Sequence, residues 1–164
     1  MIGAGLGGIG AAAMLRRAGI NFTVIERRSD IGGTWFENRY PGPRVDTPSR
    51  AYNHIFGADF IFSSPFSPQS ENQRYFREVV EKHGLRSNFV FDTEVQSLTW
   101  DEGTKCWTAS VKGPDGVRQL RANAVISATG IYSTPSLPDI PGMQDFRGVS
   151  FHTSRWPAGL DVAG

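Results

Sequence analysis

A run of closely spaced glycines near the start of the chain constrains the fold more than any other feature of the sequence. Gly3, Gly5 and Gly8 follow a short apolar stretch in the pattern G-x-G-x-x-G. In a strand–turn–helix unit the first glycine permits a tight turn, the second lets the backbone approach a pyrophosphate, and the third lets helix and strand pack closely. The pattern therefore predicts a parallel α/β sheet whose first helix directs its N-terminus at a phosphate group.

The residues that follow these glycines strengthen the prediction. Helix-forming residues fill 9–18, Gly19 ends them, and the β-branched and aromatic segment 22–25 is typical of a second strand. Glu26 ends that segment, near the spacing of about 20 residues at which such folds carry an acid for the ribose hydroxyls. Because a carboxylate repels a 2′-phosphate, we expect the site to hold FAD or NAD rather than NADP. The alternative is an ordinary α/β turn followed by a surface glutamate.

Composition narrows the class of protein further. The 164 residues carry 17 Lys and Arg against 16 Asp and Glu, which argues against a nucleic-acid-binding protein. The single cysteine, Cys106, excludes a disulfide framework or a multi-cysteine metal site and favours a reducing, cytoplasmic compartment. His54 and His83 lack the spacing of metal ligands, so we expect no metal. No apolar run reaches the about 20 residues that a membrane helix needs.

The remaining chain alternates between irregular and regular segments. Glycine, proline and aromatic residues crowd 32–66, and this length favours a ligand-wrapping loop over an idle connection. Residues 70–84 predict a helix with an apolar face, capped through Ser70 and Gln73. We expect strands at 89–91, 95–100, 107–112, 117–121 and, as a buried strand, at 124–127.

A second cluster of glycine and aromatic residues lies within the long loop. Residues 32–35 read Gly-Gly-Thr-Trp and residues 38–42 read Asn-Arg-Tyr-Pro-Gly, and Asp46 follows as an ionisable group. The paired glycines would let the backbone run along a cofactor, and the aromatic side chains would wall a flat ring system. Composition alone leaves a packed surface loop as an equal alternative.

Together with Ala128-Thr129-Gly130, these motifs resemble the FAD-binding half of class B flavin-dependent monooxygenases. The run Phe146-x-Gly148-x-x-x-His152-x-x-x-Trp156-Pro157 resembles the fingerprint of the Baeyer–Villiger type. The stretch 37–49 is most similar to the 4-hydroxyacetophenone monooxygenase subgroup. The resemblance implies a Rossmann-type FAD-binding domain over 1–134, with a parallel sheet and an inserted β-meander, and a linker with the fingerprint over 135–164.

This resemblance also implies a reaction and a set of cofactor contacts. NADPH would reduce FAD, and one oxygen atom of O₂ would be inserted next to a ketone carbonyl to give an ester or lactone. Asp46 is the implied catalytic residue. The implied contacts are Gly3, Gly5, Gly7 and Gly8 at the pyrophosphate, Glu26 at the adenosine ribose, Val95 at the adenine, Gly33, Thr34, Trp35, Phe36, Glu37, Asp46 and Tyr52 along the flavin, Arg44 toward NADPH, Ala128 and Gly130 at the cofactor, and His152 and Trp156 at a hinge between cofactor domains.

Other functions stay open at this point. An N- or S-oxygenating flavin monooxygenase, an NAD-dependent dehydrogenase and a non-catalytic FAD-binding module all agree with the first motif. Both ends of the chain are expected to be cut, because the first strand is shorter than the usual roughly five residues and no second G-x-G-x-x-G follows for an NADP domain. We therefore expect the chain alone to be inactive.

Overall fold

The computed structural model of the chain describes residues 1–53 and 59–161, so His54 lies outside the described residues. A small parallel sheet stands at the centre, where β1 (Val24–Ile25) pairs with β2 (Phe89–Val90). Ile2 bridges in parallel to Ile25 on one side and to Ser127 on the other. The predicted parallel α/β arrangement is confirmed, although its strands are short.

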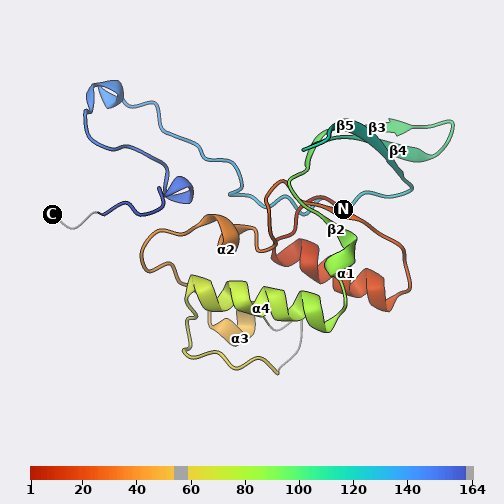
Figure 1. Ribbon diagram of the computed structural model, residues 1–164, viewed down its shortest axis with the longest axis horizontal. Helices are drawn as coiled ribbons and strands as arrows, with labels where there is room; N and C mark the ends of the chain where they lie inside the picture. The colour runs from red at the N-terminus through yellow and green to blue at the C-terminus, as the bar shows by residue number, and fades with distance from the viewer. Residues whose placement is uncertain (54–58, 162–164) are drawn as a thin grey trace.

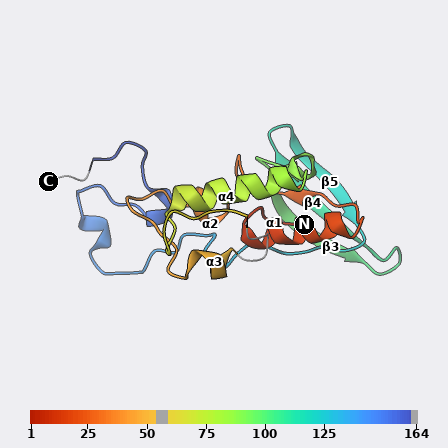
Figure 2. The same cartoon turned by 90° about the horizontal axis from the view of Figure 1, so that it is seen from below.

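Two helices cover this sheet and lie side by side (Figure 1, Figure 2). They are α1 (Leu6–Arg17) and α4 (Gln69–Lys82). Ile9 of the first helix and Phe76 of the second have no exposed surface, and both belong to one core cluster with Val24 of β1. The core of the molecule therefore lies where these helices meet the central sheet.

The starts of both helices differ from the sequence prediction. α1 begins at Leu6 rather than residue 9, because the close packing of Gly8 on the preceding turn outweighs the low helix propensity of glycine. α4 begins after Pro68 with no side-chain cap, so the predicted capping box of Ser70 and Gln73 is wrong. Gln73 is instead buried, and its side chain donates a hydrogen bond to the neighbouring loop.

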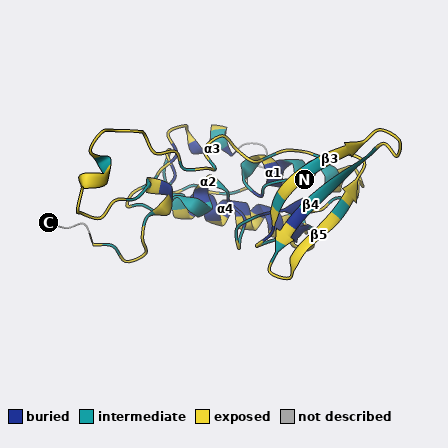
Figure 3. Ribbon diagram, turned by 90° about the horizontal axis from the view of Figure 1, so that it is seen from above, coloured by how far each residue is buried: buried dark blue, intermediate teal, exposed yellow. Residues whose placement is uncertain are grey.

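The expected β-meander forms a separate layer. β3 (Glu94–Asp101), β4 (Cys106–Gly113) and β5 (Gly116–Ala122) pair antiparallel in that order. Trp100 and Trp107 face each other across the first hairpin, with ring centroids 5.4 Å apart. Figure 3 shows that much of this layer is exposed. The meander therefore adds little to the main core.

The predicted ligand-wrapping loop contains two single-turn helices, α2 (Thr34–Glu37) and α3 (Ser49–Tyr52). The first of these contacts α4. Another short turn, η2 (Arg86–Asn88), leads into β2. The loop is thus packed against α4 along part of its length, and this packing holds α2 in a fixed position beside the central sheet.

The last part of the chain carries little regular structure. The prediction of a buried strand at 124–127 is wrong, since only an isolated bridge forms there, at Ser127, and Ile126 is 39% exposed. The reason is that this segment meets the sheet only at Ile2, through a single bridge from Ser127. Beyond it, η3 (Met143–Asp145) and η4 (Thr153–Arg155) are short turns in a segment that runs away from the sheet (Figure 1).

Candidate functional site

The glycine-rich turn forms one wall of the candidate site. A Cβ on Gly8 would overlap the carbonyl oxygen of Gly3, so only glycine lets α1 start this close to the strand before it. Gly5 is the N-cap of α1 and provides no side-chain cap, and the first turn of the helix contains no acidic residue. Helix geometry leaves the N–H groups of Leu6 and Gly7 without an intrahelical acceptor. This end of the helix is therefore suited to an anion.

A second pair of glycines crosses the first turn. Gly32 donates its N–H to the Ala4 carbonyl oxygen over 2.8 Å. Gly33 has a φ of 54°, and a Cβ on it would lie 2.9 Å from the Cα of Gly5. Both walls of the site here consist of backbone, so a ligand can approach closely without meeting side chains.

α4 holds this glycine loop from behind. Gln73 is 6% exposed, and its Nε2 donates to the Ile31 carbonyl oxygen over 2.7 Å. One helical turn earlier, Gln69 donates through Nε2 to the Trp35 carbonyl oxygen. The two glutamines therefore fix both ends of the glycine pair by hydrogen bonds to its flanking backbone.

Glu26 stands at the end of β1, beside the first turn, and is 6% exposed. Its Oε2 accepts the N–H of Ala4 over 2.7 Å, and its Oε1 accepts the N–H of Arg28 over 2.8 Å. These two donors hold the carboxylate in place. Each carboxylate oxygen keeps a further lone pair for a ligand hydroxyl.

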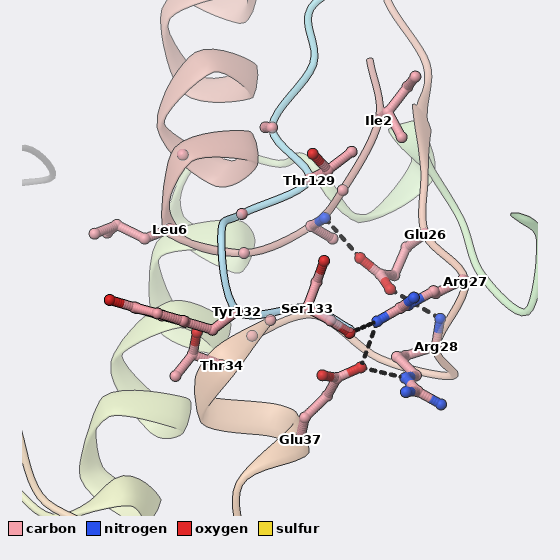
Figure 4. Close-up of a pocket in the computed structure, with 18 of the residues that line it drawn as sticks. Ile2, Leu6, Glu26, Arg27, Arg28, Thr34, Glu37, Thr129, Tyr132 and Ser133 are labelled. Atoms are coloured by element: carbon pink, nitrogen blue, oxygen red, sulfur yellow. Dashed lines mark hydrogen bonds and ion pairs between the residues drawn. The ribbon is translucent and has the colours of Figure 1, made fainter. Parts of the chain in front are cut away.

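These walls enclose a cavity of about 440 Å³ (Figure 4). The indole of Trp35 is buried in its wall and donates through Nε1 to the hydroxyl of Tyr52 over 3.1 Å. The cavity brings together many of the residues expected from the sequence. These are Gly3, Gly5, Gly7, Glu26, Gly33, Thr34, Trp35, Glu37, Tyr52, Val95, Ala128 and Gly130.

Other expected site residues lie outside this cavity. They are Gly8, Phe36, Arg44, Asp46, His152 and Trp156. Asp46 is exposed and accepts the hydroxyl of Thr47 over 3.4 Å. Arg44 donates through Nη1 to the Phe66 carbonyl oxygen over 3.0 Å, and the guanidinium of Arg39 stacks on the Phe36 ring. Their roles stay predictions.

The fingerprint residues form a small local structure. The N–H of Ser154 donates to Nδ1 of His152 over 3.2 Å, so this histidine caps η4. The Trp156 ring meets the Phe151 ring edge-on, with centroids 4.9 Å apart. Arg155 connects this structure to the site, since its Nη1 lies 3.8 Å from Oε2 of Glu37.

Sequence reasoning missed one group of cavity residues. They are Arg27, Arg28, Thr93, Glu94, Tyr132, Ser133 and Thr134. These residues follow β1, β2 and the bridge residue Ser127, which all pair in parallel. The carboxyl ends of parallel strands meet at one edge of a sheet, where ligands bind in this class of fold. That rule was the signal that could have found them.

Asp30, which lies outside the cavity, is an acidic side chain with a perturbed pKa. Burial raises the pKa of Asp30, but hydrogen bonds from the Ile31 N–H, from Arg86 and from Arg77 outweigh it and lower the pKa below its ordinary value. Arg77 Nη2 and Arg86 Nη1 lie 2.9 Å and 3.0 Å from this carboxylate. Asp30 therefore ties the loop after β1 to α4 and η2.

Metal and membrane features are missing from the part of the chain that the structure describes. Within residues 1–53 and 59–161, no group of three His, Cys, Asp or Glu side chains could hold a metal ion. None of the described helices combines the length and apolar character that a membrane span requires. Cys106 is a free, half-buried thiol.

Comparison with known proteins gives the family. The family profile described as pyridine nucleotide-disulphide oxidoreductase matches residues 1–162. A Baeyer-Villiger monooxygenase of Streptomyces coelicolor is 42% identical over 166 residues, covering 100% of this chain and 31% of that protein. An acetone monooxygenase (methyl acetate-forming) of Gordonia sp. is 34% identical and covers the same shares. The chain thus spans 31% of the length of these two relatives.

Solved structures agree with these relatives. The crystal structure of OTEMO in complex with FAD and NADP has a TM-score of 0.86 at 36% identity, covering 97% of this chain and 30% of that one. The open crystal structure of cyclohexanone monooxygenase has a TM-score of 0.85 at 33% identity, covering 99% and 32%. The resemblance to Baeyer–Villiger monooxygenases is confirmed, and the chain belongs to the pyridine nucleotide-disulphide oxidoreductase family.

Proposed function

We propose that the chain is the FAD-binding part of an NADPH-dependent monooxygenase that inserts one oxygen atom of O₂ next to a ketone carbonyl. The observation that carries the proposal is the presence, in one cavity, of the uncapped N-terminus of α1 and the buried Glu26 carboxylate. These groups match a pyrophosphate and a ribose with free hydroxyls. Relatives named Baeyer-Villiger monooxygenase support the choice of reaction.

The residues present fit the ADP half of FAD. The N–H groups of Gly5, Leu6 and Gly7 would hold the pyrophosphate, because this end of α1 has neither a side-chain cap nor an acidic residue. Glu26 would accept hydrogen bonds from the ribose hydroxyls. Val95 lines the same cavity and would offer its backbone to the adenine.

The same cavity offers a wall for the flavin half. Thr34, Trp35, Glu37 and Tyr52 line it, and the Trp35 ring is held by the core and by Tyr52. When bound, FAD supplies the redox chemistry that activates O₂. The part of the aromatic side chains of Trp35 and Tyr52 is to orient the flavin ring and to exclude water from it.

Roles beyond the cavity are part of the same proposal. Asp46 is proposed as the catalytic carboxylate, Arg44 as a contact for NADPH, and His152 with Trp156 as the hinge between cofactor domains. The proposed division places the FAD-binding domain at 1–134 and the linker to an NADP-binding domain at 135–164. These assignments rest on the family resemblance, because none of the four side chains lines the cavity.

A small-molecule ketone is the proposed substrate class. One relative is an acetone monooxygenase, and another is a monooxygenase of a trimethylcyclopentenylacetyl-CoA.

We also propose a cytoplasmic location. The support for it is that the chain's single cysteine, Cys106, is a free thiol, which suits a reducing compartment.

A titration of the chain with FAD, followed by flavin fluorescence, tests the proposal. Wild type should bind FAD, and Glu26→Gln should lower the affinity about 10- to 100-fold, as expected for a lost charge-assisted hydrogen bond. Glu71→Gln is the matched control, because Glu71 is also buried and accepts a backbone N–H, from Ser63 over 2.9 Å, outside the cavity. Binding of NAD without FAD would instead favour a dehydrogenase.

A further inference from the structure

Two arginines directly follow the acid that ends β1, and one carboxylate holds both of them. Arg27 Nη2 lies 3.2 Å from Oε1 of Glu37, and Arg28 donates through Nε to the same oxygen. Arg27 also donates to the Ser133 carbonyl oxygen, so its guanidinium connects α2 with the loop after residue 128 (Figure 4). The Glu37 side chain is only 9% exposed, and those of the two arginines are 32% and 33% exposed.

In this arrangement, side chains that favour two different adenosines lie beside the ribose site. Glu26 favours a ribose with free hydroxyls, whereas an arginine near this acid accommodates the 2′-phosphate of NADP in related folds. Arg27 and Arg28 both line the cavity. A guanidinium binds phosphate as well as carboxylate, in the same fork geometry. The repulsion of a 2′-phosphate by Glu26 is therefore effective only if these arginines are paired with another group.

We propose that Glu37 is a specificity-determining residue of this site. By pairing with Arg27 and Arg28 it withholds both guanidinium groups from a 2′-phosphate, and the site selects an adenosine with a free 2′-hydroxyl. The inference rests on the proposed function, in which one enzyme uses FAD and NADPH at different places. Without the charge of Glu37, the two arginines would draw NADPH into the FAD site.

Calorimetric titration of the full chain with two probes tests this inference. ADP-ribose and 2′-phospho-ADP-ribose share the ADP half of FAD and differ only in the 2′-phosphate. Wild type should bind ADP-ribose at least about tenfold more tightly, and Glu37→Gln should shrink that ratio about tenfold by strengthening the binding of the phosphorylated probe. Glu37→Asp should shrink it less, because a shorter side chain cannot reach both arginines.

Matched variants separate this role from a general loss of structure. Glu71→Gln removes a buried carboxylate outside the cavity and should keep the wild-type ratio. Adding Arg27→Gln and Arg28→Gln to Glu37→Gln should restore the wild-type preference, because the groups that attract the phosphate are then gone.

The outcomes for the inference and for the proposed function differ. An unchanged ratio in both Glu37→Gln and Glu37→Asp, with ADP-ribose still bound, would overturn the role of Glu37 and leave the proposed function intact. A wild-type chain that binds neither FAD nor ADP-ribose would overturn the proposed function, and the inference with it.

Discussion

The glycine-rich turn and the fingerprint segment both carry motifs, but the molecule holds them by different means. The turn at 3–8 is fixed by backbone: Gly3 donates to the Ile25 carbonyl oxygen over 2.9 Å, and Gly8 has no room for a Cβ. In the segment at 146–157 the His152 hydrogen bond and the Trp156 ring contact join near neighbours in sequence, one ion pair reaches Glu37, and Phe146 is 64% exposed. Backbone packing therefore fixes the conformation of the first motif, whereas the second motif has space around its side chains for a substitution.

The two regions should differ most in how much unfolding free energy they lose when one methyl group is added to a glycine. Gly8→Ala forces a Cβ against the Gly3 carbonyl oxygen, which is backbone and cannot move aside, so we expect a loss of about 3 kcal/mol or more in unfolding free energy. Gly148→Ala meets only the exposed ring of Phe146, and we expect less than about 0.5 kcal/mol. Urea unfolding of both variants measures the contrast. Equal losses would contradict it.

How much the sequence predicts also differs between the regions. The turn, Glu26 and the meander follow from local patterns, because glycine spacing and strand alternation are enforced over a few residues. The hydrogen bond from Gln73 to the Ile31 carbonyl oxygen and the hold of Glu37 on two arginines join residues from separate elements. Such tertiary contacts leave no periodic signal, so the sequence alone did not indicate them.

A smaller effect is expected at Gln73, which supports the loop that carries Gly32 and Gly33. Gln73→Leu leaves the Ile31 carbonyl oxygen buried without its donor, which should lower the unfolding free energy by about 1–3 kcal/mol. Gln96→Leu is the control, because Gln96 is exposed and donates to Glu94 on the meander. Its change should stay within about 0.5 kcal/mol. A Gln73→Leu variant as stable as wild type would show that the loop does not depend on this hydrogen bond.

The ion pairs that Asp30 forms with Arg77 and Arg86 should make a pH-dependent contribution to the unfolding free energy. Because hydrogen bonds from Ile31, Arg86 and Arg77 lower its pKa in the folded chain, the contribution is present at neutral pH. It disappears as the pH falls below the ordinary aspartate value and through the lowered pKa of the folded state. Asp30→Asn should cost about 0.5–1 kcal/mol at pH 7 for these partly exposed pairs.

Unfolding of wild type and Asp30→Asn at pH 7 and at pH 3 checks this prediction. The difference in unfolding free energy between the two proteins should become smaller at the lower pH, where the wild-type carboxylate begins to take up a proton. A gap that stays constant with pH would show that the loss comes from packing instead of charge.

The smallest effect is expected where the fingerprint segment contacts α2. Arg155 Nη1 lies 3.8 Å from Oε2 of Glu37, and its side chain is 40% exposed. Arg155→Gln should therefore change the unfolding free energy by less than about 0.5 kcal/mol, as surface ion pairs do. A loss above about 1 kcal/mol in urea unfolding would mean that the fingerprint segment is anchored far more firmly than its exposure indicates.

The central claim is that a backbone turn and one buried acid hold the ADP half of FAD, and a crystal structure of the chain with FAD tests it most directly. We expect the pyrophosphate to lie against the N–H groups of Gly5 to Gly7. We also expect ribose hydroxyls within about 2.5–3.0 Å of the Glu26 carboxylate. Flavin density elsewhere, with the turn and Glu26 left without contact, would contradict it.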